Sequence, residues 1–161
     1  MTQPLPRPLI HDLIEIAESL ANQQGRPLLR QTALRRAVSS AYYAVFHAVC
    51  AVCADELVGR SKVALSEPIY RSIDHGLARK RLNGPAVRPI DPSLPRVGVI
   101  FAELQEQRHA ADYSPPQPLF SRTRALALID QAREAVRLIE ALETGQRQQL
   151  AILLIGRQRA A

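Results

Sequence analysis

The segment Leu34-Arg-Arg-Ala-Val-Ser-Ser-Ala-Tyr-Tyr-Ala-Val-Phe-His-Ala48 decides the fold of this chain. It lies inside a stretch, residues 28–58, that holds no glycine or proline, so nothing there interrupts a long helix. Alanine recurs along the stretch at helical spacing, which permits close approach of neighbouring helices. Apolar residues cover most sides of this helix. We therefore expect it to lie at the centre of the molecule.

The other helices follow from apolar residues that recur at spacings of three and four. We expect helices at 8–24, 67–82, 94–111 and 121–142, with Ser121 as the N-cap of the last, and a short apolar helix at 146–155. Residues 83–95 hold four prolines and are predicted to form a loop. No alternation typical of strands is present. The sequence thus predicts an all-α fold, an antiparallel up-down bundle of four main helices with a short C-terminal helix.

At 161 residues the chain is expected to form one domain and to need no disulfide. We assign residues 1–145 to the bundle and residues 146–161 to a basic helical tail that packs on the bundle or on a partner. No run of 18 apolar residues is evident, so we expect no membrane-spanning helix. The first eight residues lack the pattern of a signal peptide, which predicts a cytoplasmic protein.

The net charge of +6 comes mostly from arginine, which supplies 19 of the 21 basic residues. Arginine suits phosphate because its planar guanidinium binds two oxygens at once. The alternative is that a GC-rich genome favours arginine codons. The basic residues are scattered in small groups, and no block of five or six like charges indicates a nucleic-acid-binding tail.

The long central helix carries an unusual polar stripe. Positions four, seven and eleven residues apart share one side of a helix, and here they hold Arg36, Ser40, Tyr43 and His47. Buried polar groups need partners, so these side chains should meet a neighbouring helix. One hypothesis is a polar latch that fixes helix register. The other is that His47 titrates, or binds a phosphate near Arg36.

The predicted helix 94–111 carries a second polar group. Arg108 falls on the same side as the apolar Phe101 and Leu104, and Asp112 follows it by one turn. His109 and Tyr113 are likewise one turn apart, on the next face. The structural interpretation is an arginine anchored by a carboxylate at a helix end. The functional interpretation is an RNA phosphate site, with Arg108 as the clamp and His109 as acid or base.

These two segments resemble the HEPN domain (higher eukaryotes and prokaryotes nucleotide-binding). The matching motifs are Arg-Ala-x-Ser-x-Ala-Tyr-Tyr-Ala-x-Phe-His-Ala, at 36–48, and Arg-His-x-Ala-Asp-Tyr, at 108–113. The resemblance covers roughly residues 9–142. It implies a helical bundle that often dimerises, and a role in RNA processing, defence or a toxin–antitoxin pair.

The chain departs from the family's ribonuclease motif, an arginine followed four to six residues later by histidine. Arg108 matches the arginine, but Tyr113, Ser114 and Pro115 stand where the histidine would fall. This leaves catalysis open. We expect a protein that associates with RNA or a nucleotide and that forms a homodimer. We further expect that it has a cognate protein partner. The alternatives are an active metal-independent ribonuclease using Arg108 and His109, a non-catalytic partner of a small nucleotidyltransferase, and a purely structural latch.

We predict no metal site and no cofactor. Cys50, Cys53 and His47 lie three residues apart on one helix, too widely spread to converge on one ion, and structural zinc usually takes four ligands. Two buried thiols are the alternative. The remaining histidine of interest, His75, is expected to face solvent.

Overall fold

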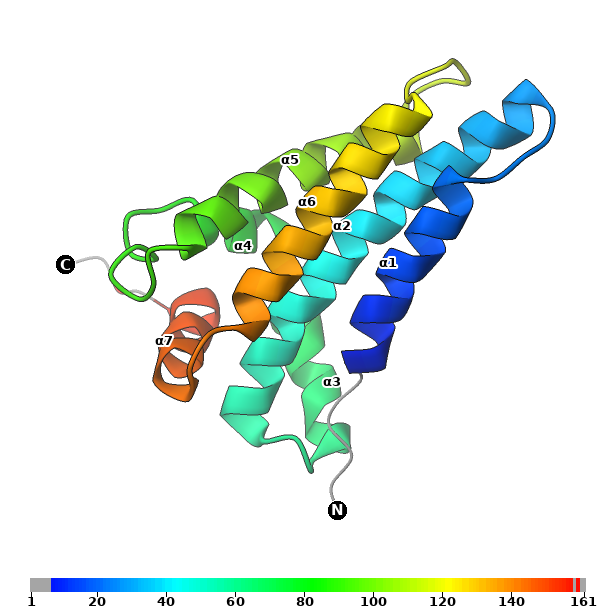
Figure 1. The fold of residues 1–161 in the computed structure, drawn as a ribbon. Helices are drawn as coiled ribbons and strands as arrows, with labels where there is room; N and C mark the ends of the chain where they lie inside the picture. Colours follow the sequence, from blue (N-terminus) through cyan, green and yellow to red (C-terminus); the bar gives the residue numbers. More distant parts are fainter. Residues whose placement is uncertain (1–6, 158, 160–161) are drawn as a thin grey trace.

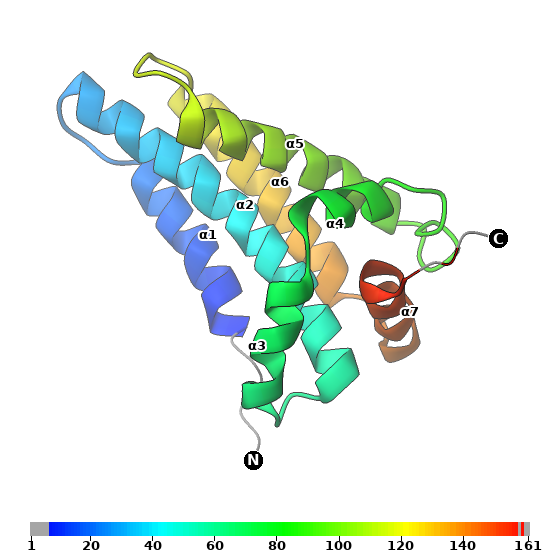
Figure 2. The same cartoon turned by 180° about the vertical axis from the view of Figure 1, so that it is seen from behind.

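The structure is a computed structural model that describes residues 7–157 and residue 159. Seven helices and no strand form its described part, which confirms the all-α prediction. Figures 1 and 2 show them from opposite sides. They are α1 (Arg7–Ala21), α2 (Pro27–Val58), α3 (Val63–Ser72), α4 (His75–Leu82), α5 (Leu94–Tyr113), α6 (Arg122–Glu140) and α7 (Thr144–Ile155).

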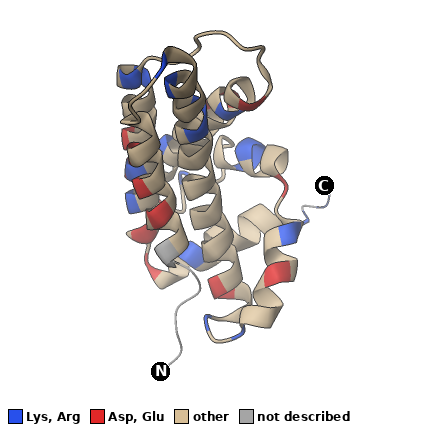
Figure 3. Cartoon of the chain, turned by 90° about the vertical axis from the view of Figure 1, so that its right-hand side faces the viewer, with Lys and Arg blue, Asp and Glu red and all other residues tan. Residues whose placement is uncertain are grey.

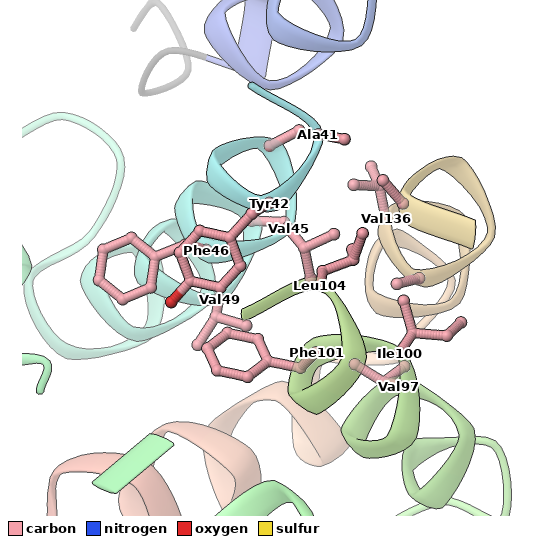
Figure 4. Packing of buried hydrophobic residues seen from close by; sticks show 14 of the residues in the cluster. Ala41, Tyr42, Val45, Phe46, Val49, Val97, Ile100, Phe101, Leu104 and Val136 are labelled. Carbon is pink, nitrogen blue, oxygen red and sulfur yellow. The ribbon is translucent and has the colours of Figure 1, made fainter. Parts of the chain in front are cut away.

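The long helix α2 lies at the centre, as predicted, because it packs against α1, α3, α5, α6 and α7. Figure 1 shows it running between α1 and α6. Its buried residues lie on every side of the helix. Over most of its length α2 therefore has no face in contact with solvent that would need polar residues. Figure 4 shows one part of this core, in which Tyr42, Val45 and Val49 meet Phe101 and Leu104 of α5.

Helix α2 is more apolar on average than the absence of an unbroken apolar run suggests. It contains an 18-residue window with a mean hydropathy of 1.6, long and apolar enough by composition to cross a membrane. Within the structure, 83% of that window is buried by other helices. A core helix of this kind meets the same test as a membrane span, so its apolarity is accounted for by packing.

The predicted helix at 67–82 is wrong in its extent, because the chain forms two helices there. α3 ends at Ser72, and Ile73 is extended. Asp74 then begins α4 as its N-cap, with its carboxylate accepting a hydrogen bond from the Leu77 amide at 2.7 Å. The break lets α4 turn away from α3 and pack beside α5, as Figure 2 shows. It brings His75, the first residue of α4, against α2.

The connection from α5 to α6 is tied to the start of α2. The Arg35 guanidinium donates to the backbone carbonyls of Ser114, Pro115 and Gln117 at 2.6–3.0 Å. The Gln31 side chain accepts from the Phe120 amide and donates to the Phe120 carbonyl, much as a backbone peptide would. These contacts fix the C-terminal turn of α5, where the second polar group lies.

Helix α6 begins after Ser121, whose hydroxyl accepts from the Arg124 amide at 3.0 Å, so the predicted N-cap is confirmed. Helix α7 packs on α2 and α4 through its buried Leu150, Ala151 and Leu154. The predictions made for the first six residues and for the last residues of the tail, 158, 160 and 161, lie outside the described residues.

Candidate functional site

Helices α2 and α5 bring Arg108 against two tyrosines. The guanidinium carbon of Arg108 lies 5.2 Å from the ring centroid of Tyr42 and 5.7 Å from that of Tyr43. A guanidinium over an aromatic face is attracted by the ring quadrupole, by about 0.5–2 kcal/mol. Nη1 of Arg108 also donates to the Tyr43 hydroxyl at 3.4 Å. Of the residues predicted from the polar stripe of α2, Tyr43 is thus the one in contact with Arg108.

One carboxylate serves two arginines in this cluster. Oδ1 of Asp112 accepts from Nη2 of Arg36 at 2.7 Å, while its Oδ2 lies 3.6 Å from Nη1 of Arg108. Arg36 and Arg108 come from different helices, so Asp112 joins α2 to α5. Two guanidiniums facing one carboxylate leave an excess of positive charge, which is the arrangement that attracts a further anion.

The hydrogen-bonding capacity of Arg108 is largely unused. A guanidinium offers five N–H donors. Within the described residues, Arg108 makes one long hydrogen bond and one ion-pair contact, both from Nη1. Its Nε is buried and has no hydrogen-bond partner there. The side chain keeps 16% of its surface exposed, so solvent or a ligand can still reach it.

Next to Arg108 the surface forms a shallow groove of about 470 Å³. Arg79 and Glu106 form an ion pair across it, from α4 to α5. The exposed His109 also borders the groove, so the two residues of the predicted catalytic pair reach one surface feature despite being adjacent on the helix. The groove is lined by Gly76, Arg79, Gln105, Glu106, Arg108 and His109.

The remaining predicted residues lie at or outside the edge of the cluster. Tyr113 is 69% exposed, and its ring lies 4.9 Å from that of His109. Ser40 is half-buried and makes no side-chain hydrogen bond within the described part of the chain. Neither is brought to Arg108 by a described contact.

His47 faces α3 and not the arginines. Its ring centroid lies 5.8 Å from Tyr70 and 6.5 Å from Tyr43, and no described hydrogen bond joins it to Arg36 or Arg108. Its Nδ1 is buried without a partner in the described structure. Burial lowers the pKa of His47, because a charged imidazole would lose hydration. The hypothesis that His47 binds phosphate beside Arg36 finds no contact to support it.

The prediction that His75 faces solvent is wrong. It is not simply solvent-facing: its Nδ1 lies 2.5 Å from the Tyr42 hydroxyl, and its ring stacks on Phe46 with centroids 3.9 Å apart. Burial and the nearby charge of Arg108 lower the pKa of His75, while Asp74 opposes them. The N-cap residue Asp74, which begins a new helix before His75, was the signal in the sequence that could have found it.

The two cysteines are buried and free. Burial raises the pKa of Cys50 strongly and that of Cys53 to about 12, so both thiols stay protonated. No group of three or more histidine, cysteine or acidic side chains that could hold a metal ion is found within the described residues. Basic and acidic positions are interspersed along several helices, as the colours of the ribbon in Figure 3 show.

Comparison of the chain with protein-family models, with curated proteins and with solved structures finds no significant match.

Proposed function

We propose that this chain is a HEPN-like protein that binds RNA or a nucleotide by holding a phosphate at Arg108. The observation that carries the proposal is a guanidinium fixed over two tyrosine rings, most of whose donors find no partner among the residues that the structure describes. Phosphate oxygens are the partners that suit such a group, because they accept paired hydrogen bonds and carry the opposite charge. We also propose that α1, α2, α5 and α6 form the antiparallel bundle expected of that family.

The charge around the groove supports the same proposal. Arg36, Arg79 and Arg108 face two carboxylates, those of Asp112 and Glu106, which leaves one positive charge in excess. A partly buried positive charge beside a groove is screened less by salt than one on open surface. This charge therefore attracts an anion locally, in addition to the weaker attraction from the net charge of +6.

Binding of a short, labelled single-stranded RNA tests the proposal. Arg108→Gln should weaken binding about 10-fold or more, because it removes at least one charge-assisted hydrogen bond of roughly 1.5 kcal/mol. The matched control is Arg96→Gln, which makes the same change of charge on the same helix about 18 Å away along its axis. Arg96 is paired with Glu134 and lies outside the groove. Equal affinities of the two variants would refute the proposal.

A ribonuclease is the second candidate, and the shared position of Arg108 and His109 on the groove favours it. The same incubations, analysed on a denaturing gel, decide between binding and cleavage. If the chain is a ribonuclease, the wild type should give cleavage products, and these products should be absent with both the Arg108→Gln and the His109→Gln variants. Intact RNA with the wild-type chain eliminates it and leaves the binding proposal in place.

The structural latch makes the opposite prediction for the same variants. If Arg108 and Tyr43 serve only to join α5 to α2, then Arg108→Gln and Tyr43→Phe lower the melting temperature and leave RNA affinity at the wild-type value. Melting curves recorded beside the binding measurements therefore separate a loss of stability from a loss of the anion site.

A further inference from the structure

The structure holds a second polar pair beside Arg108, formed by Tyr42 and His75. Tyr42 has no exposed surface, and its hydroxyl lies 2.5 Å from Nδ1 of His75. The imidazole is held from a second direction by Phe46, whose ring is inclined to it by 17° at a centroid distance of 3.9 Å. Two contacts of this kind fix both the position and the rotation of the His75 ring.

The burial of Tyr42 decides which nitrogen of His75 carries the proton. Desolvation raises the pKa of Tyr42 far above its usual value, so the hydroxyl keeps its proton and must donate it. Within the described residues, Nδ1 of His75 is the one hydrogen-bond partner of that hydroxyl. Nδ1 therefore accepts, and the proton of the neutral ring lies on Nε2.

Nε2 of His75 is free to act as a donor. The residue is half-exposed, its Nε2 makes no hydrogen bond within the described chain, and it is not among the buried unpaired atoms. The groups around the ring are Tyr42, Tyr43 and His47 of α2, Arg108 of α5 and its own neighbour Asp74. Of these, Arg108 and His47 disfavour a second proton on the ring and Asp74 favours it.

We propose that His75 donates its Nε2–H to the same phosphate that Arg108 binds, and that Tyr42 is the positioning residue that fixes this tautomer. The inference deepens the proposed function and rests on it. His75 is not itself a lining residue of the groove, but it directly precedes Gly76, which is one. The His75 ring and the Arg108 guanidinium both lie against the rings of Tyr42 and Tyr43, so the two donors come close together from different helices, α4 and α5. A phosphate has several acceptor oxygens and takes a neutral donor beside a charged one without added repulsion.

Nitrogen-15 NMR of the labelled full-length chain tests the tautomer directly, because protonated and unprotonated ring nitrogens differ widely in chemical shift. The expected spectrum of wild-type His75 at about pH 7 shows a protonated Nε2 and an unprotonated Nδ1. Addition of the short single-stranded RNA should move the Nε2 signal. In Tyr42→Phe the tautomer preference should be lost. A protonated Nδ1 in the wild-type chain would overturn the proposal.

Affinity for the same RNA provides the second test. The double variant Tyr42→Phe/His75→Phe removes both partners of the buried hydrogen bond, which costs less stability than leaving one unpaired, and keeps an aromatic ring against Phe46. It should bind about 10-fold more weakly than wild type, the loss of one hydrogen bond to a charged group. The matched control, His11→Phe, changes a histidine of α1 that is paired with Glu140 of α6.

The outcomes separate the two proposals. If Arg108→Gln binds RNA like the wild type, the proposed phosphate site itself fails. If binding depends on Arg108 while the double variant retains wild-type affinity, the site stands and the role of His75 is refuted. Loss of affinity in the double variant, with His11→Phe unchanged, supports both.

Discussion

At the scale of single residues, the cluster depends on side chains that stabilise one another in pairs. A buried tyrosine hydroxyl is costly unless its proton has an acceptor, and Tyr42 finds that acceptor in His75. Arg108 lies across both tyrosine rings, where a cation is favoured. Asp112 offsets part of its charge. Burying any of these polar or charged groups without its partners would cost free energy, and their contacts with one another offset that cost.

The two half-buried histidines make stability depend on pH. Burial lowers the pKa of His47 and of His75 below their values in the unfolded chain. As the pH falls, the unfolded state therefore binds more protons than the folded state does. The contribution of these two histidines to the free energy of unfolding is therefore complete above about pH 6.5, and the free energy of unfolding falls as the pH drops below that value. Denaturant unfolding at a series of pH values checks this, and His47→Gln should flatten the decline.

A free energy of unfolding that rises between about pH 7 and pH 5 would contradict the environment described for both histidines. His11→Gln is the control, because His11 is exposed and its replacement leaves the two half-buried rings in place.

The sequence could predict the contact between Arg108 and Tyr43, because helical periodicity puts both on inward faces of their helices. It could not predict the partner of Tyr42. That partner comes from α4, and its placement depends on a connection of two residues, Ile73 and Asp74, whose direction is set by packing and not by local propensity. Nor could periodicity show that His47 faces Tyr70, since α3 was not separated from α4.

At the scale of helices, the close approach of α4 and α5 depends on Gly98. A Cβ atom at this position would lie 2.3 Å from the backbone carbonyl oxygen of Leu82, at the end of α4. The Asn83 side chain donates to the Gly98 carbonyl at 2.9 Å and so holds the two elements together. Because α4 carries His75, this contact also sets the distance between that histidine and Arg108.

Gly98→Ala should destabilise the chain by about 1–3 kcal/mol, because the clash is with backbone that must move as a unit. Gly145→Ala is the control. Gly145 lies in the first turn of α7, where nothing lies within 4 Å of an added Cβ, so alanine there should be neutral or stabilising by up to about 1 kcal/mol. Thermal or denaturant unfolding of the two variants measures the difference. Equal stabilities would show that α4 does not pack against α5 as described.

At the scale of the whole molecule, the class of fold followed from one helix. A stretch of 32 residues without an internal glycine or proline, apolar on most sides, can be stable in this chain only if other helices surround it. The number and ends of the surrounding helices were less predictable, because short helices such as α3 and α4 depend on tertiary contacts more than on propensity. The candidate site lies where α2 meets α5 and the first residue of α4.

The measurement that tests the central claim most directly is the NMR spectrum of the arginine Nε–Hε groups during titration with single-stranded RNA. The Nε of Arg108 is buried, which should slow exchange with water and keep its signal visible. Its assignment follows from the signal missing in Arg108→Gln. The account predicts that this signal moves on addition of RNA while that of Arg96 stays in place. RNA binding that shifts other arginine signals and leaves Arg108 unchanged would contradict it.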